Sequence, residues 1–151
     1  VPRAGAGDDA GSAVAPAAAI GYVGDKLESK RHGHGVYTYE DGKRYDGQWV
    51  EGKMHGKGRY EWPNGARFEG EWKNGAMNGK GTMVYGDGGK YEGGFKDNKW
   101  HGRGVMNYAN GDTFDGEWAD GFIHGKGVYT RASGKVTHGR WVRGELFETE
   151  A

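Results

Sequence analysis

Apolar and polar side chains alternate along most of the chain, in short stretches that end at glycine-rich turns. In the stretch YDGQW, Tyr45 and Trp49 lie on one face of an extended chain, whereas Asp46 and Gln48 lie on the other. Residues 56–62 alternate in the same way. A period of two residues is typical of a strand with one buried face, so the pattern predicts β-strands.

The alternating stretches recur every 23 residues from Tyr22 onward. Counted from the residue that opens each repeat, glycine occupies positions 3, 12, 14 and 21 in five consecutive repeats. Position 5 is Trp or Phe in the second to sixth repeats. The opening residues are Tyr22, Tyr45, Phe68, Tyr91, Phe114 and, in a last partial repeat, Thr137. A fixed period of this length indicates an array of identical supersecondary units.

Glycine-containing dipeptides separate the stretches and predict hairpins. Asp41-Gly42 and Asn64-Gly65 join one repeat to the next, and Gly52 supplies a residue that tolerates positive φ inside a repeat. Because every turn is tight, neighbouring strands are antiparallel. The sequence therefore predicts an all-β fold, a single-layer twisted antiparallel β-meander, as a solenoid of consecutive 23-residue hairpins.

A three-residue turn at positions 19 to 21 fixes the expected register between repeats. On the polar face this register places Lys57 opposite Glu71, and Arg103 opposite Glu117. Opposite charges across a strand pair are favourable, so we expect both to form charge pairs. On the other face, glycines opposite tryptophans leave room for the rings to lie on the backbone, so the aromatic residues are the predicted core.

Composition restricts the class of protein. Aromatic residues make up 13% of the chain and 32 residues are glycine, but only four are leucine or isoleucine. The 21 basic and 21 acidic residues balance, which argues against a nucleic-acid partner, and the absence of cysteine excludes disulfides. We expect a flexible Ala/Gly/Pro-rich lead-in at 1–21, the array at 22–147 and a tail at 148–151.

These residues resemble the MORN (membrane occupation and recognition nexus) repeat family, whose pattern is close to YxGxW, a turn glycine, HGxG and a second turn glycine. The resemblance implies one long twisted sheet in which each repeat is a hairpin. The first repeat departs from the pattern at Lys26 and Ser29, and the last at Thr137 and Phe147-Glu148. Atypical end repeats are typical of the terminal caps of a repeat array.

Several motifs invite a catalytic or ligand-binding interpretation. GKG at 56–58 recurs at 79–81 and 125–127, but no helix follows, so the context of a phosphate loop is missing. The carboxylates lie on the polar face opposite basic residues, where nothing raises a pKa. No nucleophile–base set is visible. We therefore expect no enzyme activity and no cofactor.

One histidine per repeat recurs at position 11, where Asn78 replaces it in the third repeat. Neighbouring repeats lie about 10 Å apart, whereas zinc ligands converge within about 2 Å of one ion. A metal site is therefore not expected, with His32 beside His34 as the one exception left open. We expect these side chains to bond within the turn. The four histidines are His32, His55, His101 and His124.

The leading functional hypothesis is a non-catalytic scaffold that binds a partner protein. A helix or extended segment, or a second copy of the chain, would cover the aromatic face. Trp100 and Phe122 fall in the turns within repeats, outside the repeating aromatic positions, and are further candidates for partner contact. The predicted partner-binding residues are Tyr45, Trp49, Tyr60, Trp72, Phe95, Trp100, Trp118, Phe122, Tyr129 and Trp141.

An alternative is a peripheral membrane module that binds anionic lipid headgroups through a basic edge near positions 9 to 13. The residues are Lys30, Arg31, Lys53, Lys57, Lys80, Lys99, Arg103 and Lys126. A third reading is a subunit of a large assembly. Families of this kind imply ciliary, cytoskeletal or membrane-junction scaffolds, so we expect an intracellular, cytoplasmic location. Because the chain lacks an initiator methionine, organelle import stays open.

Overall fold

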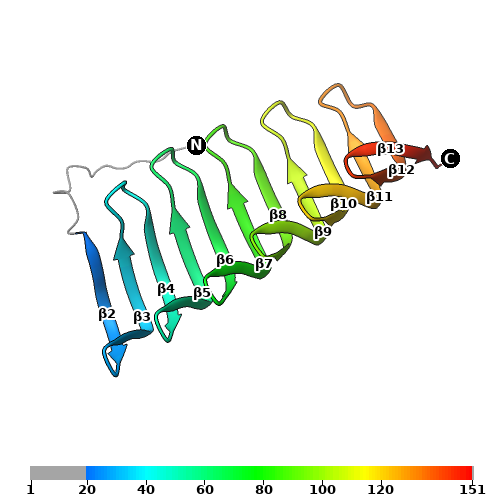
Figure 1. Cartoon of the computed structure of the whole chain (residues 1–151). Helices are drawn as coiled ribbons and strands as arrows, with labels where there is room; N and C mark the ends of the chain where they lie inside the picture. The colour runs from blue at the N-terminus through cyan, green and yellow to red at the C-terminus, as the bar shows by residue number, and fades with distance from the viewer. Residues whose placement is uncertain (1–19, 151) are drawn as a thin grey trace.

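The computed structural model describes residues 20–150 as one open antiparallel sheet of 12 strands (Figure 1). The strands lie side by side in chain order, so each pairs with its sequence neighbours, and the predicted single-layer meander is confirmed. The strands are β2 (Gly21–Leu27), β3 (Lys30–Thr38), β4 (Arg44–Val50), β5 (Lys53–Glu61), β6 (Arg67–Lys73), β7 (Ala76–Val84), β8 (Lys90–Lys96), β9 (Lys99–Asn107), β10 (Thr113–Ala119), β11 (Phe122–Thr130), β12 (Val136–Val142) and β13 (Glu145–Thr149).

The sheet differs slightly from the predicted boundaries of the array. Strand β2 begins at Gly21, within the expected lead-in, and β13 continues to Thr149, within the expected tail. The remainder of the lead-in, residues 1–19, lies outside the described residues.

Two kinds of turn alternate along the sheet, and both were predicted. The loop between repeats has three residues: Tyr39 N–H donates to the Lys43 carbonyl at 2.9 Å, and Gly42 adopts a φ of 96°. The loop within a repeat has two residues, Glu51 and Gly52, with φ of 48° and 81°. Positive φ at both central residues is the type I′ geometry that matches the twist of antiparallel strands.

The predicted register between repeats is confirmed, but the predicted charge pairs do not form as expected. Lys57 lies opposite Glu71, and Arg103 lies opposite Glu117. Arg103 instead pairs with Asp115 at 3.4 Å. The two glutamates accept backbone N–H groups of the strand that follows them, so their carboxylates are already engaged.

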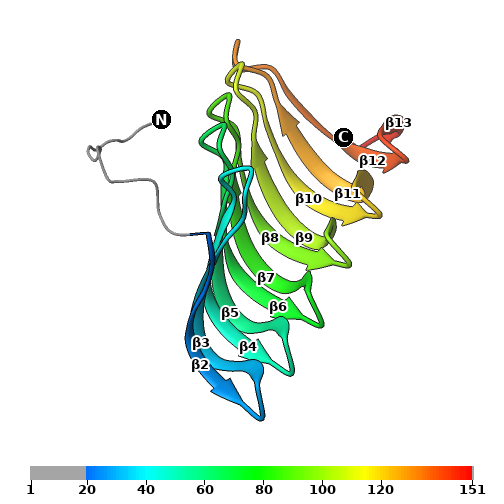
Figure 2. The ribbon, with the colours of Figure 1, turned by 60° about the vertical axis from the view of Figure 1, so that its left-hand side comes forward.

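These backbone contacts belong to a bulge in each within-repeat hairpin. The register shifts between Gly47 and Trp49 of β4, and β5 carries the extra residues. Bulges bend strands and increase their twist, and Figure 2 shows that the strands curve strongly. In β5 the bulge contains the GKG motif, where Gly56 has a φ of 72° and the Lys57 N–H donates to Gln48 Oε1 at 2.7 Å. The motif is therefore structural here, as expected.

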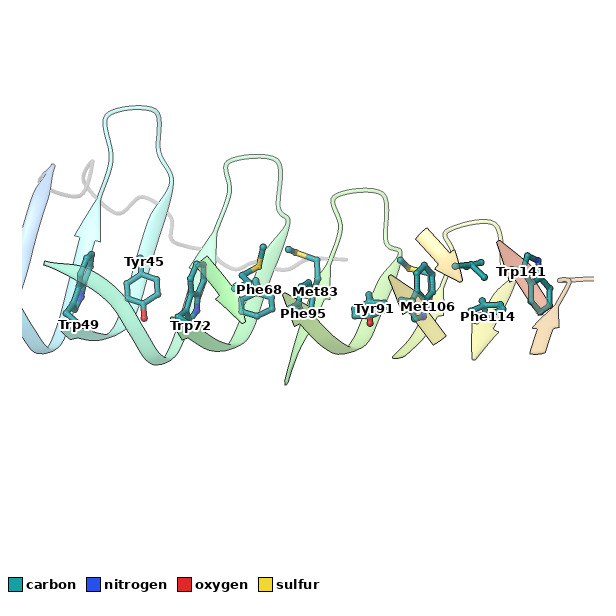
Figure 3. Packing of buried hydrophobic residues seen from close by; sticks show 13 residues of the cluster. Tyr45, Trp49, Phe68, Trp72, Met83, Tyr91, Phe95, Met106, Phe114 and Trp141 are labelled. Atoms are coloured by element: carbon teal, nitrogen blue, oxygen red, sulfur yellow. The ribbon is translucent and has the colours of Figure 1, made fainter. Parts of the chain in front are cut away.

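Inside the curve, aromatic rings from positions 1 and 5 form one row (Figure 3). The rings alternate edge-to-face: Tyr45 lies 5.0 Å from Trp49 and 5.3 Å from Trp72, at interplanar angles of 82° and 86°. Such pairs contribute about 0.5–1.5 kcal/mol each beyond the area that they bury. We call this set the inner row. It consists of Tyr22, Trp49, Tyr45, Trp72, Phe68, Phe95, Tyr91, Trp118, Phe114 and Trp141.

Glycine is required beneath the inner row because the rings lie on the backbone. A Cβ added at Gly58 would collide with the phenol of Tyr45, and one at Gly104 would collide with the phenol of Tyr91. The indole of Trp72 also reaches the backbone there, donating from Nε1 to the Gly58 carbonyl at 3.1 Å. Gly58 therefore accommodates the ring of Tyr45, and its carbonyl accepts a hydrogen bond from the indole of Trp72.

Candidate interaction surface

Six of the ten residues predicted to bind a partner are buried core residues, and none of the six is more than 6% exposed. The expectation that they line an open docking surface is therefore wrong. A flat sheet would leave these rings uncovered, but this sheet bends around them, and neighbouring rings cover one another's faces. The six are Tyr45, Trp49, Trp72, Phe95, Trp118 and Trp141.

Trp100 is partly buried and packs against the core rather than projecting from an exposed turn. It lies in β9 opposite Phe95, where other repeats place methionine or isoleucine opposite tryptophan. Its ring lies 5.3 Å from Trp118 and 5.6 Å from Tyr91, and its Nε1 donates to the Tyr85 hydroxyl at 2.9 Å. In the fourth repeat the large ring has moved to the facing strand, so Trp100 compensates for the smaller Phe95.

Phe122 is 44% exposed and remains available for contact. It begins β11 beside the short turn, and the guanidinium of Arg143 lies 5.4 Å from its ring centre. Stacking of this kind covers one face of the ring and leaves the other to solvent. Partner contact through Phe122 stays a prediction.

A second set of aromatic residues lies on the same face as the inner row, nearer the long hairpin loops, and is only partly buried. We call it the outer row. Its residues pack against one another and against the core: Tyr60 lies 4.6 Å from Trp62, 6.1 Å from Tyr39 and 5.9 Å from Trp72. The outer row consists of Tyr37, Tyr39, Tyr60, Trp62, Tyr85, Tyr108 and Tyr129.

Of the outer row, only Tyr60 and Tyr129 were among the predicted partner-binding residues. The signal for the others is in the sequence, because they recur at positions 16 and 18 of the repeat. Periodicity places both rows on one face of the sheet but does not say which row the bend encloses. The distinction depends on the position of the bulge, which lies beside the inner row.

Partial burial changes the chemistry of the outer phenols. Burial raises the pKa of Tyr60 and Tyr85 to about 12. Burial, followed by a 2.7 Å hydrogen bond to Asp112, raises the pKa of Tyr129 to about 12. The same bond, together with the Ala132 N–H, lowers the pKa of Asp112, which is 9% exposed. These hydroxyls stay neutral over the physiological range and act as hydrogen-bonding groups.

The predicted basic edge is divided between two places and is interrupted by acids. Four residues lie at position 13, on the face opposite the rings, and Arg103 among them pairs with Asp115. The four are Lys57, Lys80, Arg103 and Lys126. Lys30, Lys53 and Lys99 follow the short turns, which themselves carry Glu28, Glu51, Asp97 and Asp120. The surface therefore lacks the uniform positive charge that was expected, and lipid contact stays an untested prediction.

Arg31, the remaining residue of that set, is half-buried and contributes to the core. Its guanidinium lies 4.9 Å from the ring centres of both Tyr37 and Trp49, and it donates to the Gly52 carbonyl at 3.3 Å. Cation–π contacts of this kind favour Arg over a point charge. Arg31 therefore covers the end of the inner row at the first repeat.

The expectation that the position-11 side chains bond within the turn holds only in part: His124 and Asn78 bond to the turn of the following repeat, whereas the buried His101 Nδ1 has no hydrogen-bond partner among residues 20–150. His124 Nδ1 accepts the Arg143 N–H at 3.2 Å, and Asn78 Oδ1 accepts the Asp97 N–H at 3.2 Å. Across residues 20–150, no group of three or more His, Asp or Glu side chains is placed to hold a metal ion. The same residues include no helix long and apolar enough to cross a membrane.

The fold and its two aromatic rows define an open-sheet repeat protein built from hairpins of fixed length. The MORN repeat family matches residues 22–44, 45–67, 68–90, 91–113 and 114–136, so the chain belongs to this family. MORN repeats are modules that mediate protein or membrane interactions. The family membership predicted from the sequence is confirmed.

Other comparisons add little. No curated protein matches the chain. Among solved structures, the TCP domain of SAS-4 (dCPAP) of Drosophila melanogaster, in complex with a proline-rich motif of Ana2 (dSTIL), shows 11% sequence identity and a TM-score of 0.24. The match covers 79% of this chain and 85% of that chain. A likeness at this TM-score carries no argument about fold or function.

Proposed function

We propose that the protein is a non-catalytic scaffold whose outer row binds an apolar segment of a partner protein. The observation that carries this proposal is the row itself: seven partly buried rings that follow one face of the sheet from the first repeat to the fifth. Partly exposed Tyr and Trp side chains combine a large apolar area with a polar tip, the combination enriched at protein interfaces.

The spacing of the repeats limits the partner segment. Two strands per repeat place equivalent rings about 9.6 Å apart, at about 4.8 Å per strand. Seven residues of an α-helix advance about 10.5 Å, so a helix with apolar residues at heptad spacing keeps nearly in step with the rings. A segment covering five repeats in this way would be about 30 residues long.

Site-specific photocrosslinking tests the proposal. A photoreactive phenylalanine analogue replaces Trp62 in the outer row or, as the matched control, Glu69 on the opposite face. We expect the Trp62 position to capture a defined partner in native extract, with the crosslinked peptide mapping to one apolar segment. That segment, made as a synthetic peptide, should then bind the purified chain, and binding should weaken about tenfold with Trp62→Ser.

The control at Glu69 shows whether the partner binds the outer row or the opposite face of the sheet. If the Glu69 position captures the same segment as efficiently as the Trp62 position, the outer row is not the docking surface. Circular dichroism of both photoreactive proteins establishes that the sheet is intact, so that loss of capture cannot arise from unfolding.

A further inference from the structure

The fourth repeat lacks a side chain that other repeats use inside the bulge. At position 4, Gln48, Glu71 and Glu117 each point a side-chain oxygen at the bulge of the facing strand, whereas the fourth repeat has Gly94. The oxygens accept the N–H groups of Lys57 at 2.7 Å, Lys80 at 2.6 Å and Lys126 at 2.7 Å. The equivalent residue in the fourth repeat is Arg103, and Gly94 can offer it no side-chain acceptor.

The space that this side chain fills elsewhere is open in the fourth repeat. In the second, third and fifth repeats, a Cβ added at the bulge glycine would collide with the Oε1 atom of Gln48, Glu71 or Glu117. Gly102 occupies the same place with a similar φ of 82°, yet apart from its chain neighbours His101 and Arg103 no residue has an atom within 4 Å of the position that its Cβ would take. Gly102 keeps the positive φ, but the bulge backbone differs before it, because the His101 carbonyl lies where the position-4 Cβ lies in the other repeats.

A bulge of this kind is suited to bind an anion. Successive backbone N–H groups around a residue of positive φ form a concave nest that binds negatively charged oxygens. The three filled bulges show that a side-chain carboxylate or amide oxygen fits the nest, because Glu71, Glu117 and Gln48 occupy it. The chain itself thus provides the template for the missing ligand.

The charges around the open nest also favour an anion. Lys80 lies directly opposite Gly94 in the β7–β8 ladder, and Lys96 follows two residues later on the same face. Neither lysine forms an ion pair with any side chain in residues 20–150. The nearby Asp97 is held by Asn78, through a backbone bond at 3.2 Å and a side-chain bond at 3.4 Å.

One repeat earlier, the same positions form a pocket of about 650 Å³ that contains an acid of the chain's own. It is lined by His55, Lys57, Glu71 and Lys73, together with Trp72, Asn78 and two glycines. In the next repeat, 23 residues later, Gly94 takes the position of Glu71. The two lysines are kept, because Lys80 and Lys96 take the positions of Lys57 and Lys73. A Cβ at Gly94 would collide with the His101 carbonyl, so the fourth repeat cannot supply its own acid without a backbone shift.

We propose that the bulge at residues 101–103 is a carboxylate-binding site that takes an Asp or Glu side chain of a partner protein. The backbone nest around Gly102 binds the carboxylate oxygen, and Lys80 and Lys96 complement its charge. The site lies on the face opposite the aromatic rows, so it is independent of the segment that the outer row binds. The residue that it binds is an Asp or Glu in an extended segment of the partner, as Glu71 and Glu117 are in strands β6 and β10.

Amide chemical shifts measured by nuclear magnetic resonance test this site on the intact chain. The probe is a blocked Gly-Glu-Gly peptide, with blocked Gly-Leu-Gly as the matched control. We expect the glutamate peptide to shift the Gly102 and Arg103 amides saturably, while the amides of Lys57 and Lys126 stay fixed because the side chains of Gln48 and Glu117 fill those two nests. Absence of a shift at Gly102 and Arg103, or equal shifts at the filled nests, would overturn the proposal.

Two further measurements identify the class of ligand and the lysines that bind it. Inorganic phosphate should shift the same amides less than the peptide, and a response to phosphate alone would contradict carboxylate recognition. Lys80→Gln and Lys96→Gln should each weaken peptide binding roughly threefold at low salt, whereas Lys53→Gln at a distant turn should not.

A gain-of-site variant makes the test independent of Gly94. Glu117→Ala empties the nest of the fifth repeat, so the peptide should then shift the Lys126 amide as well. An unchanged Lys126 amide in this variant, with the sheet intact by circular dichroism, would show that an empty bulge does not bind carboxylate.

Discussion

Each glycine at positions 3 and 14 is explained by a specific neighbour rather than by flexibility. Position 14 lies beneath the ring of position 1, and position 3 faces the backbone of that same glycine across the ladder. Large rings and bare backbone therefore replace the usual interdigitated aliphatic side chains. The rings have few rotatable bonds, so ordering them costs less side-chain entropy than ordering methionines such as Met77, Met83 and Met106.

Gly58→Ala tests this packing. The added methyl group collides with the phenol of Tyr45, so we expect the free energy of unfolding to fall by about 1–3 kcal/mol, measured by denaturant titration. Asn107→Ala, at an exposed position of β9, is the control and should change stability by less than about 0.5 kcal/mol. Similar stability of the two variants would show that the ring does not lie on Gly58.

Trp100→Ala tests the reassignment of that residue to the core. It removes contacts with Tyr91 and Trp118 and leaves the Tyr85 hydroxyl without its donor, so we expect a loss of about 2–4 kcal/mol. Phe122→Ala is the control and should cost less than about 1 kcal/mol, because the ring is 44% exposed. Thermal unfolding of the two variants at equal midpoints would contradict the core assignment.

At the scale of the hairpin, the sequence predicts the strands, the turns and the register, because each depends on local patterns that recur five times. It does not predict the bend. The Lys57–Glu71 pair shows why. The cross-strand register suggests an ion pair, but Glu71 instead accepts the Lys80 N–H from the bulge of its own hairpin. The bend determines which row of rings becomes buried. A prediction that assumes a flat sheet therefore assigns the interaction surface to residues of the inner row, which are buried.

The short turns give a paired test at this scale. Ser29 adopts a φ of 71° where other repeats have glycine, so Ser29→Gly should stabilise the sheet by about 1 kcal/mol. Asn98 has the same φ, but its Oδ1 accepts the Met77 N–H at 2.8 Å, so Asn98→Gly should bring no such gain. Denaturant midpoints compare the two variants, and equal gains would show that the asparagine bond contributes nothing.

At the scale of the whole molecule, the buried phenols link stability to alkaline pH. Tyr60, Tyr85 and Tyr129 have a pKa of about 12 in the folded chain against 10.0 when unperturbed. A raised pKa means that the folded state holds the proton more tightly. Their contribution is therefore complete below pH 10 and is lost as the pH rises to about 12. Tyrosinate absorbance should rise together with unfolding, and full ionisation near pH 10 in a folded chain would contradict their burial.

The charge pattern of the whole molecule bears on the membrane alternative. Acids at the short turns, and Glu71 and Glu117 opposite Lys57 and Arg103, break up the positive field, so we expect weak co-sedimentation with anionic liposomes that disappears at physiological salt. Neutral liposomes are the control. Tight, salt-resistant binding to anionic liposomes would favour a membrane role over the protein scaffold.

One curved face of the sheet carries a buried inner row, which holds the sheet together, and a partly exposed outer row, which we propose binds a partner. Hydroxyl-radical footprinting read by mass spectrometry measures the exposure of both rows in one experiment. We predict that Trp62, Tyr39 and Tyr108 are modified much faster than Trp72 and Trp118 in the folded chain. Equal rates for the two rows, or faster modification of the inner row, would show that the bend of the sheet does not enclose the inner row.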